Sequence, residues 1–251
     1  MLDKIDLKEI EIIARQAGII IMEIYNRDFP IEYKDDKSPL TEADLASHQV
    51  IVEALAKFNL PILSEEGKNI PYEERKYWEY YWCIDPIDGT KEFIKKNGEF
   101  TINIALIHKD TAVLGVVYAP VLEDMYMAKK GEGAFKNGQK LPLKMNDTPQ
   151  KSLRIVASKS HLSSETQTFI DHLAKDTEKI EQVSKGSSLK LVMVAEGEAD
   201  IYPRLAPTME WDTAAAHAVV LEAGKTVLQY ESKIRLVYNK ENLLNPWFIV
   251  K

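Results

Sequence analysis

Two aspartates, Asp85 and Asp88, stand three residues apart in the hexapeptide DPIDGT at 85–90. Carboxylate oxygens are the ligands that hard divalent cations prefer. Pro86 fixes its own φ, and Gly89 permits backbone conformations that other residues resist, so a rigid turn here could aim both carboxylates at one point. The same residue types also build ordinary solvated turns. The hexapeptide therefore indicates a metal site but leaves that simpler interpretation open.

Three further acids stand where helices or strands are expected to begin or end: Asp44 at a helix start, Glu65 after a short apolar strand, and Asp212 before an alanine-rich helix. Each has a structural alternative, namely a capping box at 41–44, a solvated loop at 65–66, and a helix N-cap at Asp212. Taken together they favour a ligand site, because ligands gather at strand ends in open α/β sheets. The five histidines show no metal-ligand spacing, so the set favours Mg²⁺, with Mn²⁺ as a substitute, over zinc. Mg²⁺ held by few carboxylates leaves room for water and phosphate, as in metal-assisted phosphoryl hydrolysis.

The first half of the chain is expected to form helices packed on an antiparallel sheet. Apolar residues recur at helical spacing over 7–26 and 41–58. Strands are expected at 62–63, 81–84, 100–107, 112–118 and 124–128, with the hexapeptide as the turn after 81–84 and a hairpin turn at Asn137-Gly138.

A polar stretch at 146–151 predicts a boundary between a subdomain 1–150, with most of the acids, and a subdomain 151–251 that completes the site. Beyond it strands and helices alternate, which predicts an α/β arrangement. The expected elements are strands at 153–157, 180–183, 199–202 and 226–229, and helices at 163–175, 187–196 and 212–223.

Composition excludes several classes of function. The net charge of −7 argues against polymeric nucleic acid as a partner, because such binders need a basic surface, but not against a small phosphorylated substrate. The single cysteine, Cys83, lies in an apolar stretch typical of a core and allows no intrachain disulfide. We see no signal peptide and no apolar run of membrane-spanning length, so we expect a soluble, cytoplasmic protein.

The acidic positions resemble a known set. The hexapeptide, the acids at 65–66 and the motif WDTAA at 211–215 are similar to the inositol monophosphatase superfamily of Mg²⁺-dependent, lithium-sensitive phosphatases, and the similarity extends through 39–44, 115–120 and 131–135. The resemblance implies a mixture of α+β and α/β structure, namely the layered α/β/α/β/α sandwich of the sugar-phosphatase type. It also implies phosphoric monoester hydrolysis.

Roles for the acids follow from this resemblance. Glu65, Asp85 and the carbonyl of Ile87 would hold the first Mg²⁺, and Asp85, Asp88 and Asp212 the second. Glu65 would also take part in a weaker third site, so two to three ions are expected.

The resemblance also implies catalytic residues. Thr90 paired with Asp44 would orient and deprotonate the attacking water, and the backbone of Gly89 and Thr90 would donate to phosphate oxygens.

Within the superfamily, the segments 158–161, 186–190 and 202–208 resemble the 3′(2′),5′-bisphosphate nucleotidases. Lys159 replaces the commoner arginine of the first segment, which changes the donor geometry. The implied substrate is adenosine 3′,5′-bisphosphate, cleaved to AMP and phosphate in sulfate assimilation. The implied substrate site comprises Glu65, Ile87, Asp88, Gly89, Thr90, Ser158, His161, Gly186, Ser187, Lys190, Arg204 and Asp212.

Alternatives remain at this stage. Ser187 is equally typical of a helix N-cap, and His161 of a polar residue at a strand-to-helix turn. Inositol phosphates or fructose 1,6-bisphosphate would suit the same superfamily, and a non-catalytic divalent-cation-binding module is the interpretation from another class. A monomer and a homodimer are both compatible with the sequence, and so is peripheral association with the inner membrane.

Overall fold

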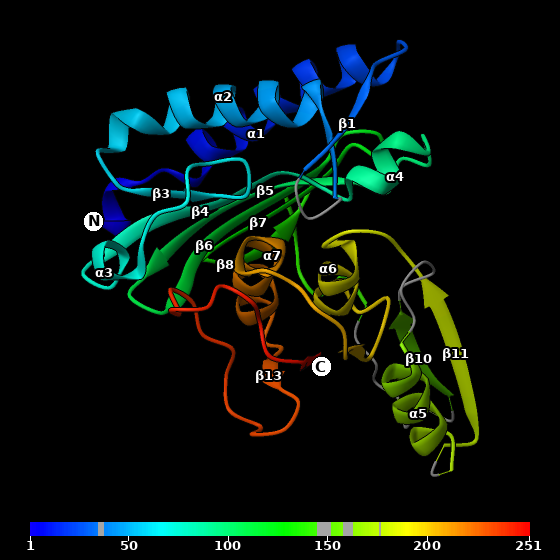
Figure 1. The fold of residues 1–251 in the computed structure, drawn as a ribbon. Helices are drawn as coiled ribbons and strands as arrows, with labels where there is room; N and C mark the ends of the chain where they lie inside the picture. The colour runs from blue at the N-terminus through cyan, green and yellow to red at the C-terminus, as the bar shows by residue number, and fades with distance from the viewer. Residues whose placement is uncertain (35–37, 145–151, 158–162, 176) are drawn as a thin grey trace.

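The structure is a computed structural model that describes residues 1–34, 38–144, 152–157, 163–175 and 177–251. Its helices and strands are stacked in layers (Figure 1). One face of a large sheet is covered by α1 (Leu7–Tyr25) and α2 (Glu42–Leu55), and the other by α6 (Leu189–Glu196) and α7 (Glu210–Glu222). A second group of short strands lies beyond α6 and α7, with α5 (Ser164–Leu173) on its outer side. The predicted α/β/α/β/α sandwich is confirmed.

The two N-terminal helices form at the predicted places. α1 buries Ile10, Ala14 and Ile21 at helical spacing. α2 ends in the tighter turn η2 (Ala56–Phe58), and a similar turn η1 (Leu2–Lys4) precedes α1. The antiparallel ribbon of β1 (Ile31–Tyr33) and β2 (Pro39–Thr41) was not predicted, because three-residue strands are too short to show an alternating pattern.

The large sheet has seven strands in the order β3-β4-β5-β6-β7-β8-β9, with β3 parallel to β4 and all other pairs antiparallel. Their bounds are Ile62–Ser64, Tyr80–Asp88, Thr101–His108, Thr111–Ala119, Asp124–Lys129, Gly133–Lys136 and Gln139–Lys140, with short helices α3 (Tyr72–Arg75) and α4 (Thr90–Ile94) at its margins. Trp82 and Ile84 pack toward α1 and α2, whereas Tyr81 and Cys83 pack on the opposite side. Because both faces are covered, the strands appear in the sequence as continuous apolar runs.

The prediction that the hexapeptide is a turn was wrong. β4 continues through Asp88, and Asp85 and Asp88 pair with Asn103 and Thr101 on β5. β4 therefore carries one extra residue, a β-bulge, and Pro86 is tolerated there because a bulge leaves ladder positions unpaired. The chain turns only at Gly89, whose φ of 95° lies in the left-handed region.

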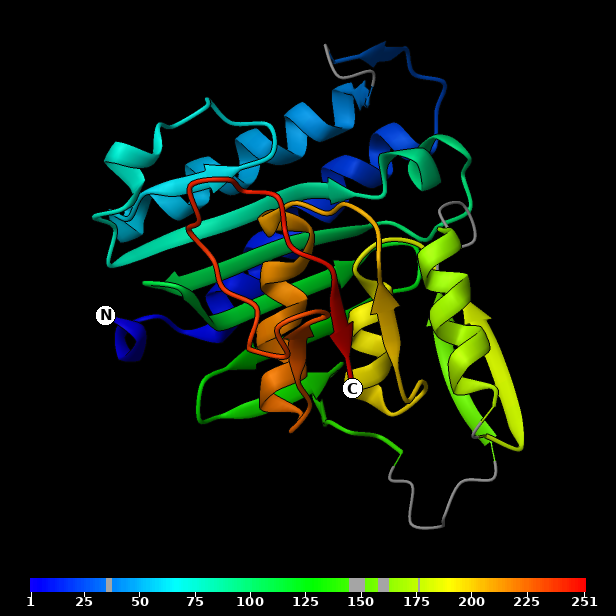
Figure 2. The ribbon, with the colours of Figure 1, turned by 60° about the horizontal axis from the view of Figure 1, so that its bottom comes forward.

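The second half follows the predicted alternation. β10 (Ser152–Ala157) is parallel to β11 (Lys179–Ser184), and β12 (Tyr202–Arg204), β14 (Phe248–Val250) and β13 (Val227–Gln229) form an antiparallel sheet. A parallel bridge from Ile155 to Ile201 links the two groups. Figure 2 shows the C-terminal strand (red) inserted beside β12. That strand, β14, was not predicted.

Helix α7 approaches the large sheet closely. A Cβ atom at Gly115 of β6 would lie 2.1 Å from the carbonyl oxygen of Ala215, so only glycine fits at this crossing. One hydrophobic core joins residues of both halves of the chain, for example Tyr81 and Val192. The division near residue 150 stays a prediction, and the stretch 146–151 lies outside the described residues. Among the helices that the structure describes, none is long and apolar enough to cross a bilayer.

Candidate active site

The bulge in β4 decides where the two aspartates point. Residues three apart on a regular strand face opposite sides, whereas one extra residue returns both to the same side. Asp85 accepts the backbone N–H of Ile87 at 3.1 Å, and Ser47 of α2 donates to the carbonyl of Pro86 at 2.9 Å. These two bonds hold the bulge. Ser47 was missed, because nothing in its sequence surroundings indicates a contact with residue 86.

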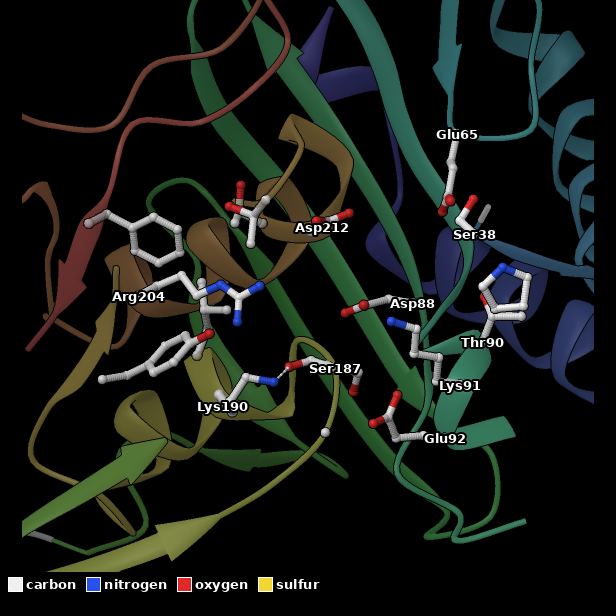
Figure 3. A pocket seen from close by; sticks show the side chains of 18 residues that line it. Ser38, Glu65, Asp88, Thr90, Lys91, Glu92, Ser187, Lys190, Arg204 and Asp212 are labelled. Atoms are coloured by element: carbon white, nitrogen blue, oxygen red, sulfur yellow. Dashed lines mark hydrogen bonds between the residues drawn. The ribbon is translucent and has the colours of Figure 1, made fainter. Parts of the chain in front are cut away.

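Asp212 and Glu65 come to the same place from other elements. Asp212 lies in the first turn of α7, and its carboxylate accepts the backbone N–H of Met209 at 2.9 Å. The helix begins at Glu210, so Asp212 is not the N-cap but the third residue of the helix. Glu65 follows β3, which runs parallel to β4. Figure 3 shows Glu65, Asp88 and Asp212 around one cavity.

The four acids Glu65, Asp85, Asp88 and Asp212, here called the acidic cluster, affect one another electrostatically. Burial raises the pKa of Asp85 well above its usual range, and the charges of Glu65, Asp88 and Asp212 add to the effect. Burial raises the pKa of Asp88 to about 6 and that of Asp212 to about 8, with neighbouring carboxylates contributing to both. Buried like charges of this kind require a cation to be stable in the ionised form.

The chemistry of the donors fits Mg²⁺. Within the described residues, no three acidic, histidine or cysteine side chains form a group that could hold a metal ion by themselves. Mg²⁺ does not need such a cage, because it is commonly held by one or two carboxylates and keeps several waters. In this structure Glu65 pairs instead with Lys34, whose Nζ lies 3.0 Å from Glu65 Oε1 and 2.5 Å from Glu66 Oε1.

Asp44 serves two bonding roles at once. Its Oδ2 accepts the backbone N–H and the hydroxyl of Thr41 at 2.7 and 2.6 Å, which is the capping box considered as the structural alternative. Its other oxygen, Oδ1, accepts the Thr90 hydroxyl at 3.3 Å. Burial raises the pKa of Asp44, against the opposing effect of the Thr41 hydrogen bonds. The structure therefore joins Asp44 and Thr90, while Thr90 also reaches the Ile87 carbonyl at 3.4 Å.

Cationic groups line the far side of the same cavity (Figure 3). Lys190 is buried, its Nζ donates to the Ser187 carbonyl at 2.6 Å, and burial lowers its pKa to about 8. Arg204 donates from Nη2 to the Pro207 carbonyl at 2.8 Å. Its Nε is buried and has no hydrogen-bond partner among the residues that the structure describes. A buried donor without a partner is rare in proteins, so this one marks a place for an acceptor on a ligand.

Glu99 holds the segment before Lys190 in place. Glu99 accepts the backbone N–H of Gly186 at 2.9 Å, and a Cβ on Gly186 would lie 2.6 Å from the Glu99 carbonyl. Ser187 has a φ of 47° and is not the N-cap of α6, which is Ser188. Ser158 and His161 lie outside the described residues, so their predicted contacts are untested.

The cavity includes residues that sequence analysis missed. Its lining comprises Ser38, Pro39, Glu65, Asp88, Gly89, Thr90, Lys91, Glu92, Gly186, Ser187, Lys190, Leu191, Tyr202, Arg204, Thr208, Asp212, Thr213 and Phe248. Lys91 follows the hexapeptide directly, and its position beside the predicted phosphate donors was the available signal. Asp44, Asp85 and Ile87 are buried and are not among the residues that line the cavity.

The sequence profile of the inositol monophosphatase family matches residues 2–247. The chain belongs to this family. Relatives in the family include the 3′(2′),5′-bisphosphate nucleotidase CysQ of Salmonella typhimurium, 44% identical over 97% of this chain and 98% of the relative. The CysQ nucleotidase of Escherichia coli is 43% identical, over 95% of this chain and 96% of the relative. Phosphatases of this family generally depend on divalent metal.

Solved structures agree with the family assignment. The crystal structure of CysQ from Bacteroides thetaiotaomicron matches with a TM-score of 0.87 and 45% identity, covering 95% of this chain and 94% of that one. The extragenic suppressor protein suhB of Bartonella henselae matches with a TM-score of 0.78 at 22% identity, over 97% and 92% of the two chains. The second likeness shows the fold alone.

Proposed function

We propose that this chain is a cytoplasmic, Mg²⁺-dependent 3′(2′),5′-bisphosphate nucleotidase that hydrolyses adenosine 3′,5′-bisphosphate to AMP and phosphate in sulfate assimilation. One observation carries the proposal: a single cavity is lined by three acids of the acidic cluster, Glu65, Asp88 and Asp212, and by a cationic pair, Lys190 and Arg204. A substrate with one reacting and one remote phosphate matches both parts. The likeness to CysQ nucleotidases supports the same choice.

The acidic cluster would hold two to three ions. Glu65, Asp85 and the Ile87 carbonyl would serve the first, Asp85, Asp88 and Asp212 the second, and Glu65 a weaker third. When bound, Mg²⁺ supplies neutralisation of the phosphoryl charge and a lowered pKa of the attacking water.

Asp44 and Thr90 would move the proton. The Thr90 hydroxyl donates to Asp44 Oδ1, so its lone pairs are available to accept a proton from the attacking water. The raised pKa of the buried Asp44 makes that carboxylate a stronger base, which suits general-base catalysis. The proton would pass from water to Thr90 and from Thr90 to Asp44. The backbone amides of Gly89 and Thr90 would donate to phosphate oxygens.

The remote phosphate would bind at Lys190 and the unpartnered Nε of Arg204. An anion supplies the acceptor that this buried Nε lacks, and it adds negative charge beside the desolvated ammonium of Lys190. Gly186 and Ser187 line the same side, and Ser158 and His161 are proposed to contact ribose or adenine.

Phosphate release tests the proposal directly. We expect Mg²⁺-dependent release from adenosine 3′,5′-bisphosphate with kcat/KM well above that for inositol 1-phosphate or fructose 1,6-bisphosphate. Preference for either of the latter would transfer the chain to the sugar-phosphate branch of the family. No release from any of the three would favour the non-catalytic cation-binding module.

Removal of the Lys190 charge should affect the bisphosphate selectively. We expect Lys190→Met, which keeps most of the side-chain stem, to raise KM for adenosine 3′,5′-bisphosphate by about 10–100-fold, as for loss of one charged hydrogen bond. KM for inositol 1-phosphate, which has no second phosphate, should change little. Lys95→Met, at the exposed C-cap of α4 and outside the cavity lining, is the matched control. Equal losses on both substrates would mean that Lys190 is structural.

Lithium should inhibit the enzyme at millimolar concentration. A small monovalent ion that enters a Mg²⁺ position keeps the position filled but supplies half the charge, so release of product should slow. Steady-state phosphate release with lithium chloride, against equal potassium chloride, measures the effect. Equal rates in both salts at millimolar concentration contradict the expectation.

A further inference from the structure

Three buried polar side chains behind the acidic cluster form a closed ring of hydrogen bonds. Ser188 donates from Oγ to Asn103 Oδ1 at 2.9 Å, Asn103 donates from Nδ2 to Thr101 Oγ1 at 3.4 Å, and the Thr101 and Ser188 hydroxyls are 2.8 Å apart. With Ser188 donating to Asn103, the remaining bond runs from Thr101 to Ser188. All three residues are at most 1% exposed. Each hydroxyl thus donates once and accepts once, an arrangement in which hydrogen bonds reinforce one another.

The ring lies opposite the two aspartates of the bulge. Asn103 pairs with Asp85, and Thr101 pairs with Asp88, across the β4–β5 ladder. Paired residues on neighbouring strands point to the same face. Thr101 and Asn103 therefore lie on the partner strand directly opposite the β-bulge, which brings Asp85 and Asp88 to one side of the sheet.

The third member connects the ring to the substrate side of the cavity. Ser188 is the N-cap of α6, and its backbone amide donates a hydrogen bond to the Asp88 carboxylate. The first turn of the same helix carries Lys190. The ring thus fixes the middle of the segment 186–190, and Glu99 fixes its start through Gly186.

We propose that Thr101, Asn103 and Ser188 are positioning residues, which set the Asp88 carboxylate for the second metal and couple it to the start of α6. The inference rests on the proposed function for its kinetic consequences, but its effect on metal binding does not depend on the substrate. Partners that orient metal ligands typically affect metal affinity by about 10–100-fold. A purely structural ring would affect stability and leave the metal affinity unchanged.

Thr101→Val tests the proposal, because valine replaces the hydroxyl by a methyl group of similar shape. Mn²⁺ serves as the probe, titrated into substrate-free protein and followed by electron paramagnetic resonance. We expect the affinity of one class of Mn²⁺ sites to fall by about 10–100-fold. Thr101→Ser, which keeps the hydroxyl, should restore it to nearly the wild-type value. Unchanged Mn²⁺ binding in folded Thr101→Val would overturn the proposal.

A second variant provides a test if Thr101→Val does not fold. Ser188→Ala removes the other hydroxyl and should weaken Mn²⁺ binding by a similar factor. The double variant should bind Mn²⁺ about as tightly as the single variant with the lower affinity, because one substitution already breaks the ring. Additive losses would show that the two hydroxyls act independently and would overturn the ring as a unit. A wild-type protein that binds Mn²⁺ but releases no phosphate from adenosine 3′,5′-bisphosphate would contradict the proposed function and leave this test intact.

Discussion

Asp212→Asn is expected to reduce kcat for phosphate release by about 10²–10³, the loss typical of removing one preorganised electrostatic group. Asparagine keeps the shape of the side chain and can still accept the Met209 N–H that Asp212 now accepts. The change therefore removes the charge of a proposed ligand of the second metal without removing the first-turn hydrogen bond of α7. The Mg²⁺ concentration that gives half-maximal activity should rise at the same time. Steady-state phosphate release over a range of Mg²⁺ concentrations measures both effects.

The same variant should have an opposite effect on stability without metal. Burial and the nearby Asp88 charge raise the pKa of Asp212, so its ionised form is unfavourable in the folded protein. Asp212→Asn should raise Tm in EDTA, by about 2–4 °C for each kcal/mol of repulsion relieved, and should reduce the further rise produced by Mg²⁺. Asp110→Asn, at an exposed ion pair with Arg235, is the control and should alter neither quantity appreciably. Wild-type turnover in Asp212→Asn would restore the view that this residue only supports the helix start.

Asp44→Asn is expected to lower kcat by about 10²–10⁴, the contribution of a general base, with nearly unchanged Mg²⁺ dependence. The physical reason is that asparagine still accepts hydrogen bonds but cannot take a proton through Thr90. Rapid-mixing or steady-state phosphate release at saturating substrate measures the loss.

The capping role of Asp44 needs its own control, because the carboxylate also bonds Thr41. Thr41→Val removes the cap hydroxyl but leaves the Thr90–Asp44 contact; it should cost about 0.5–2 kcal/mol of stability and keep near-normal turnover. Thr90→Ala should resemble Asp44→Asn, and the two losses should not add, since both serve one proton path. Additive losses would mean that the two residues do not share one proton path. A stability defect with normal kcat in Asp44→Asn would leave only the capping role.

Much of the fold could be predicted because its signals are local. The 3.6-residue spacing of apolar residues over 7–26 and the Asn137-Gly138 turn depend on a few neighbouring residues, and the structure has both α1 and that turn. The strands β1, β2 and β14 were missed because three residues show no periodicity. Strand β14 lies at the C-terminal end of the chain and pairs with β12 and β13, which come earlier in the sequence.

In the candidate site, too, some features could be predicted from local sequence and others depend on tertiary contacts. Residue types and spacing alone determined that the carboxylate set favours Mg²⁺ and phosphoryl chemistry, because ligand preference is a property of the side chains themselves. The roles expected for Thr90 and Asp44 came from the family resemblance. Whether those side chains meet was decided by the tertiary structure. A one-residue bulge turns Asp85 and Asp88 to one face, and a glycine at 115 lets α7 bring Asp212 close. Lys34 pairs with Glu65 and Ser47 with Pro86 across more than 30 residues of chain. Such contacts depend on strand register and on helix packing, which sum over distant residues and leave no pattern in any short stretch of sequence.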